Sequence, residues 1–128
     1  MEIVDSHLRL RCEQELKNLM LRLRTRYMRT STTPQSLLET LGDMGNRFVD
    51  LLRNLIRLRE GKAPAHRAEV VQNVEGLGVD PRLLEELLAI DRGRFSPSPT
   101  EARALAERLL VAVTHAASLA DTHTESDA

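Results

Sequence analysis

The chain has 128 residues, of which 41% are hydrophobic and 2% aromatic, and its 18 basic and 19 acidic side chains leave a net charge of −1. This length suits one helical domain whose core needs no disulfide or metal, and the shortage of aromatic rings argues against recognition of single-stranded nucleic acid by base stacking. Because Cys12 is the only cysteine and no apolar run reaches the roughly 20 residues of a membrane span, we expect a cytoplasmic protein without membrane segment or cofactor.

Hydrophobic residues recur every three or four positions through most of the chain, which is the period of an amphipathic helix. No stretch alternates with the period of a strand, so the sequence predicts an all-α fold. Asp5 or Ser6 is the expected cap of the first helix, and Thr33 with Pro34 is expected to start a second helix that ends at Gly61. The predicted helices cover residues 6–29, 34–60, 65–75, 81–91 and 99–119.

Proline, glycine and polar residues delimit the three later helices. Pro64 is expected to open the third helix, and Gly76 and Gly78 are expected to break the chain after it. Ser98 and Glu101 have the spacing of a capping box, in which each side chain accepts a hydrogen bond from the backbone N–H of the other residue. The last helix should therefore begin at this pair.

The short linker between the first two helices requires them to return antiparallel. We expect a five-helix bundle in which this long helical hairpin is covered by three shorter helices. Gly42 and Gly45 interrupt the apolar seam of the second helix and predict a bend or a close helix contact, with Phe48 buried beside them. A single domain is expected over residues 1–120, followed by a disordered polar tail at 121–128.

The stretch LRLRTRYMR near the end of the first predicted helix contains four arginines and no acidic residue. At 100° per residue, Arg22, Arg26 and Arg29 lie on one side of the helix, whereas Arg24 points elsewhere. Guanidinium groups at this spacing can hold a phosphate, because each offers a planar fork of hydrogen-bond donors. The competing interpretation is a solvated or ion-paired exterior, since arginine is common in this chain and cations are favourable near a helix C-terminus.

Patterns typical of catalytic or metal sites are weak in this sequence. The four histidines are scattered, and none has another histidine or a cysteine at ligand spacing. Glu85 and Glu86 are adjacent, so they diverge on a helix and cannot work as a paired acid and base. The glycines match no known phosphate-binding loop. We therefore expect no metal site and no catalytic residue.

Four successive segments carry a resemblance to a known family. They are RLRCEQELKNLMLRLRTRYMR, NRFVDLLRNLIRLREGKAP, GLGVDPRLLEELLAIDRG and a final helix opened by Pro-Thr-Glu, and together they cover nearly the whole chain. This succession resembles the C-terminal helical domain, HEPN-like and substrate-binding, of bacterial proteins whose N-terminal half is a nucleotidyltransferase domain. The resemblance implies a bundle that packs beside the catalytic domain and helps to bind substrate or to assemble dimers.

The sequence lacks the signatures that carry activity in that family. The Gly-Ser and paired-Asp pattern that binds metal and nucleotide is absent, and so is the Arg-x4-His ribonuclease signature of HEPN toxins. The first hypothesis is therefore a non-catalytic accessory domain that serves a nucleotidyltransferase-type catalytic domain or subunit and contacts nucleotide or RNA phosphate. Its candidate substrate-facing residues are Arg22, Arg26, Arg29, Asn46 and Arg53.

The second hypothesis belongs to a different class. It is a freestanding protein-interaction module, antitoxin-like or homodimeric, whose exposed apolar surface binds a protein and which has no nucleotide role. The two hypotheses differ in their genomic expectation. A coding segment with the Gly-Ser and Asp-x-Asp pattern, upstream in frame or in a neighbouring gene, favours the first.

Overall fold

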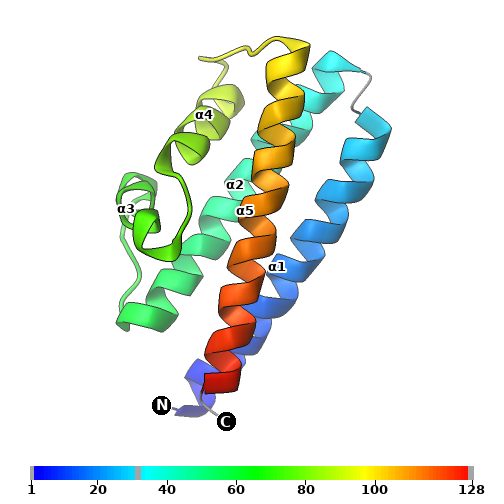
Figure 1. Ribbon diagram of the computed structural model, residues 1–128. Helices are drawn as coiled ribbons and strands as arrows, with labels where there is room; N and C mark the ends of the chain where they lie inside the picture. Colours follow the sequence, from blue (N-terminus) through cyan, green and yellow to red (C-terminus); the bar gives the residue numbers. More distant parts are fainter. Residues whose placement is uncertain (1, 31–32, 127–128) are drawn as a thin grey trace.

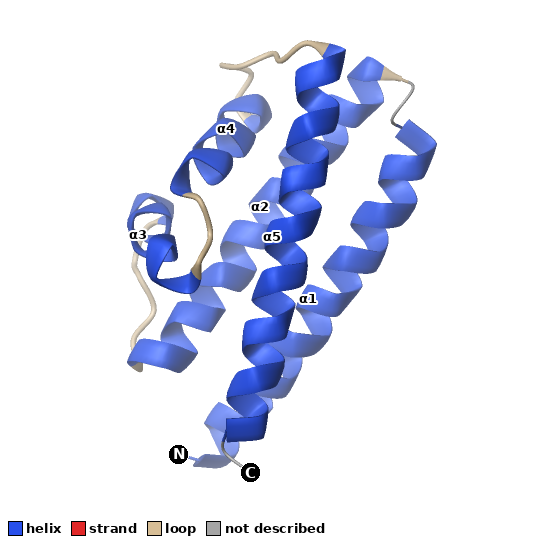
Figure 2. Ribbon diagram, viewed as in Figure 1, coloured by secondary structure: helices blue, strands red, loops and turns tan. Residues whose placement is uncertain are grey.

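The computed structural model describes residues 2–30 and 33–126, which contain five α-helices and one 3-10 turn joined by short connections (Figures 1 and 2). Within these ranges there is no strand, as the helical period predicted. Side chains are described for residues 7–29 and 33–120. The elements are α1 (Glu2–Thr30), α2 (Pro34–Glu60), α3 (Arg67–Asn73), η1 (Val74–Leu77), α4 (Pro81–Asp91) and α5 (Pro99–Ser126).

Three long helices, α1, α2 and α5, run side by side, and the short helices α3 and α4 pack mainly along α2 (Figure 1). The predicted long α1–α2 hairpin is confirmed, and the two helices are antiparallel (Figure 1). α5 packs against both, runs in the direction of α2 and ends beside the start of α1 (Figure 1). With 28 residues it is as long as the hairpin helices, so it forms a third long helix of the bundle where a shorter covering helix was expected.

The outer helices α1 and α5 extend beyond the predicted bounds. α1 begins at Glu2, so Asp5 and Ser6 lie inside the helix and neither is its cap. α5 continues through Ser126 and so passes residue 121, where the predicted polar tail begins; the last two residues of that tail lie outside the described residues. Neither end contains glycine or proline, and helix propagation continues where no residue breaks it.

The third helix begins later than predicted. Pro64 is buried in the connection after α2, and α3 starts only at Arg67. The Glu69 carboxylate in the first turn accepts a hydrogen bond from the backbone N–H of Ala65 at 3.3 Å. This contact resembles the reach-back half of a capping box and fixes the start of the helix after the proline.

The predicted starts of α2, α4 and α5 and the predicted ends of α2 and α4 are confirmed, whereas α3 ends at Asn73, two residues before its predicted end, and the 3-10 turn η1 follows it. The Glu101 carboxylate accepts a hydrogen bond from Ser98 N–H at 3.1 Å, and Ser98 Oγ accepts one from Glu101 N–H at 3.2 Å. The hydrogen bond from the Ser98 N–H lowers the pKa of Glu101, and the Ser98 side chain lowers it further by a smaller amount. Gly61 and Gly78 end α2 and η1 in the left-handed region, each with φ of 77°, which other residues rarely adopt.

The core is aliphatic and joins the three long helices to the layer of short ones. Phe48 is fully buried on α2, as predicted, and is the largest of the fully buried side chains. The predicted close helix contact is found at Gly45, where an added Cβ would lie 2.7 Å from the Cβ of Leu87 on α4. The missing side chain therefore sets the distance at which α4 packs on α2.

Candidate functional site

The basic strip predicted from Arg22, Arg26 and Arg29 lies on α1, partly along the contact of α1 with α2. The three arginines have different surroundings. Arg26 forms an ion pair with Asp43 of α2, with 2.8 Å between Nη1 and Oδ2. Arg29 is exposed in the last turn of α1. Arg22 faces a hollow between the two helices and has no hydrogen bond or ion pair with any described residue. Of these three arginines, Arg26 is ion-paired, whereas Arg22 and Arg29 have no ion pair among the described residues.

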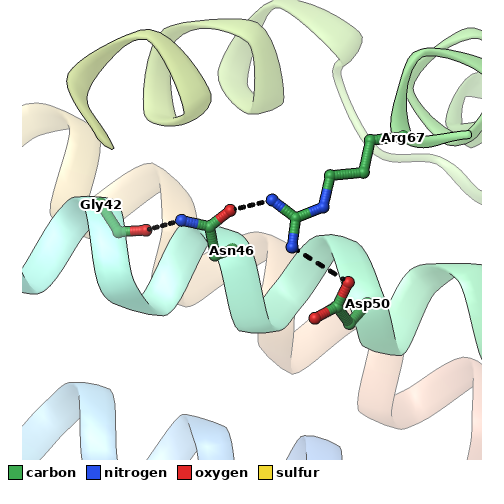
Figure 3. A network of polar contacts seen from close by, with 4 residues as sticks. All are labelled: Gly42, Asn46, Asp50 and Arg67. Atoms are coloured by element: carbon green, nitrogen blue, oxygen red, sulfur yellow. Dashed lines mark hydrogen bonds and ion pairs between the residues drawn. The ribbon is translucent and has the colours of Figure 1, made fainter. Parts of the chain in front are cut away.

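Asn46 and Arg53 belong to a different side of α2. Figure 3 shows that Asn46 bridges elements of the fold: its Nδ2 donates to Gly42 O at 3.1 Å, and its Oδ1 accepts from Nη1 of Arg67 on α3. At 100° per residue, Arg53 projects close to the direction of Asn46. The structure therefore does not gather the five candidate residues into one site, and Asn46 helps to hold α3 on α2.

The hollow between α1 and α2 has a volume of about 390 Å³. It is lined by Glu15, Asn18, Leu19, Arg22, Arg47, Asp50 and Leu51. Arg47 was not predicted as a site residue. The Arg26–Asp43 ion pair shows which residues of the antiparallel helices lie at the same level. Arg22 lies one turn before Arg26 on α1, and Arg47 lies one turn after Asp43 on α2. Arg22 and Arg47 are therefore also at the same level. That register is the signal by which Arg47 could have been found.

Both carboxylates that line the hollow already have a cationic partner outside it. Glu15 pairs with Arg11 at 3.1 Å, and Asp50 pairs with Arg67 at 3.4 Å. The two arginines of the hollow have no comparable partner among the described residues. The hollow and its immediate partners thus carry four arginines against two carboxylates, which leaves two positive charges uncompensated.

A second surface lies on α1 where the helix faces away from α2 and α5. Leu10, Leu21 and Met28 are 51%, 56% and 82% exposed and project within about 20° of one another at 100° per residue. We call these three side chains the outer face of α1. Arg24 and Arg29 border Leu21 and Met28 on opposite sides, and no acidic residue occurs in the sequence from Lys17 to Leu38. Lys17, which pairs with Glu13, projects between Leu10 and Leu21. This surface is apolar with a cationic border.

A groove with a volume of about 640 Å³ runs between α5 and the η1–α4 segment. Val111 on its rim is 70% exposed. Arg108 in the groove pairs with Asp80 at 3.0 Å, and His115 Nε2 lies 3.0 Å from Leu77 O. The rest of the lining is mostly apolar, apart from the exposed Glu107 carboxylate.

No reactive or metal-binding cluster stands out in the part of the chain with described side chains, where no three His, Cys, Asp or Glu residues come together. The Cys12 thiol is buried, and its pKa is raised to about 12, mainly by desolvation and to a smaller extent by the nearby negative charge of Glu15. Its Sγ donates to Leu51 O at 3.8 Å. None of the helices as described has the length and apolar character to cross a bilayer.

No family model, curated protein or solved structure matches this chain. The candidate surfaces of the fold are the hollow between α1 and α2, the outer face of α1 and the groove beside α5.

Proposed function

We propose that this chain is a non-catalytic helical module that docks on a nucleotidyltransferase-type catalytic domain or subunit through the outer face of α1. The observation that carries this proposal is the exposure of Leu10, Leu21 and Met28 on one side of a helix whose opposite side packs against α2 and α5. Removing large apolar side chains from water favours association, and an apolar surface with a polar border is typical of a protein-interaction site.

The charge around the outer face favours a partner of different sequence. Arg24 and Arg29 border Leu21 and Met28, and the sequence from Lys17 to Leu38 offers no carboxylate to compensate them. Two copies of this face would bring cationic borders together, whereas an apolar patch bordered by carboxylates would attract it and set its orientation. The expected partner surface is therefore apolar and acidic at its edge. Once docked, the bundle would position substrate beside the catalytic domain, as the family resemblance implies.

A second candidate is a freestanding homodimer, and the groove beside α5 favours it. Val111 is an exposed apolar residue on a groove in which Arg108 already pairs with Asp80, so of the charged groups that line the groove Glu107 alone would need a partner from a second copy. This surface lies apart from the outer face of α1. Single substitutions can therefore separate the two candidates.

We expect Leu21→Glu and Met28→Glu to weaken docking on the nucleotidyltransferase-type domain by about tenfold or more each, since a carboxylate replaces buried apolar area. Both side chains are exposed, so stability should change by no more than about 0.5 kcal/mol. Affinity would be measured by calorimetry with the catalytic domain encoded upstream in frame or in the neighbouring gene.

Val111→Glu is the matched control, because it places the same charge at an exposed apolar position on another surface. It should leave docking unchanged. If it breaks self-association while Leu21→Glu has no effect on any binding, the homodimer replaces the docking module. The absence of a Gly-Ser and Asp-x-Asp coding segment in or beside the gene would overturn the choice of partner.

The purified chain alone should catalyse no nucleotidyl transfer. That reaction requires carboxylates that gather metal ions around a triphosphate, and the sequence lacks the Gly-Ser and paired-Asp pattern that supplies them. The measurement is transfer from labelled ATP in the presence of Mg²⁺. Product formation that survives repeated purification would contradict the non-catalytic part of the proposal.

A further inference from the structure

We propose that the hollow between α1 and α2 binds a small phosphate ester, with Arg22 and Arg47 as the phosphate ligands. The two arginines come from different helices and line one hollow, yet neither has a hydrogen bond or ion pair within the described chain. This inference goes beyond docking, because it concerns a binding site of the isolated chain on a different surface from the outer face of α1.

The charge of the hollow matches a phosphate monoester. Two guanidinium groups remain uncompensated there after Glu15 and Asp50 have been paired with Arg11 and Arg67. A phosphate monoester carries roughly −1.5 to −2 at neutral pH, so it neutralises both arginines, whereas one carboxylate neutralises only one. Each guanidinium can also donate two parallel hydrogen bonds to phosphate oxygens.

The remaining lining indicates what the phosphate is attached to. Leu19 and Leu51 provide buried apolar surface, and Asn18 offers both amide donors and an acceptor. Glu15 and Asp50 each retain acceptor capacity beyond a single arginine contact, so they suit hydroxyl groups. A volume of about 390 Å³ is at the lower end of the range for small-molecule sites. The ligand class is therefore a nucleotide or a sugar phosphate.

This site replaces the predicted strip of three arginines with a pair that spans two helices. Asp43 already neutralises Arg26 at 2.8 Å, so Arg26 is a poor third ligand. Its ion pair instead fixes the register that sets Arg22 opposite Arg47. The site thus depends on the packing of α1 against α2, and a peptide of α1 alone would lack half of its phosphate ligands.

The test measures binding of adenosine 5′-monophosphate to the isolated chain. Adenosine and inorganic phosphate are tested separately, so that the contributions of the nucleoside and of the phosphate can be compared. Arg22→Gln and Arg47→Gln should each weaken binding of the monophosphate by about tenfold or more at low salt. Adenosine should bind far more weakly than the monophosphate. Titration calorimetry gives the affinities, and amide NMR shifts show whether the affected residues lie at the hollow.

Arg24→Gln and Arg57→Gln are matched controls, because each removes the same charge from α1 or α2 at an exposed position outside the hollow. They should change the affinity by less than about twofold, and all four variants should keep the thermal midpoint of the unaltered chain. Any of three results would overturn the proposal. The controls could weaken binding as much as the hollow variants do, the chain could bind neither the monophosphate nor inorganic phosphate at low salt, or it could bind single-stranded RNA without binding the monophosphate. Binding of inorganic phosphate alone would overturn its nucleotide or sugar part.

Discussion

Phe48→Ala is expected to lower the free energy of unfolding by about 3–5 kcal/mol, enough to unfold a domain of ordinary stability partly or completely. The side chain is fully buried on α2, in the core that joins the long helices to the short ones. Its removal loses the transfer free energy of the ring and leaves a cavity that rigid helices can fill only in part. Urea denaturation followed by circular dichroism measures the change through the transition midpoint.

The control for this substitution is Val111→Ala, which truncates an apolar side chain that is 70% exposed. It should change the free energy of unfolding by less than about 0.5 kcal/mol. A Phe48→Ala variant that shifts the midpoint no more than this control would place the centre of the core elsewhere.

Gly45→Ala is expected to destabilise the fold by about 1–3 kcal/mol, although alanine is the better helix former by about 1 kcal/mol. The added Cβ would lie 2.7 Å from the Cβ of Leu87, which is fixed to the backbone of α4 and cannot rotate away. One helix must therefore shift, and the contacts of α4 with α2 are lost over several residues. Thermal and urea denaturation both report the loss.

Gly76→Ala makes the same change where no atom lies within 4 Å of the added Cβ and the backbone has no positive φ. It should leave stability unchanged or raise it slightly, because alanine restricts the unfolded chain. If Gly45→Ala also stabilises the protein, helix propensity outweighs the contact, and α4 must be able to move at little cost.

Local patterns were sufficient to predict the class of fold and most helix ends. The capping box at Ser98 and the left-handed glycines at Gly61 and Gly78 act within a few residues, so sequence spacing determines them. The extended ends of α1 and α5 were missed because polar residues alone do not stop a helix.

The candidate site was harder to predict because it depends on contacts between residues far apart in the sequence. Arg22, Arg26 and Arg29 look equivalent on a single helix. Only the packing of α2 distinguishes them, since it supplies a carboxylate to Arg26 and a second arginine beside Arg22. Asn46 was predicted to face a substrate; its hydrogen bond with Arg67 could not be predicted, because the two residues lie far apart in the sequence.

The position of the end of α5 beside the start of α1 has a practical consequence for engineering (Figure 1). A domain whose two ends lie close together can be inserted into a surface loop of another protein, because the two sides of that loop stay close together. The bundle should therefore work as a cassette between two halves of a reporter enzyme. Destabilising substitutions such as Phe48→Ala would then separate the halves and reduce the reporter signal, which would allow many variants to be ranked in living cells.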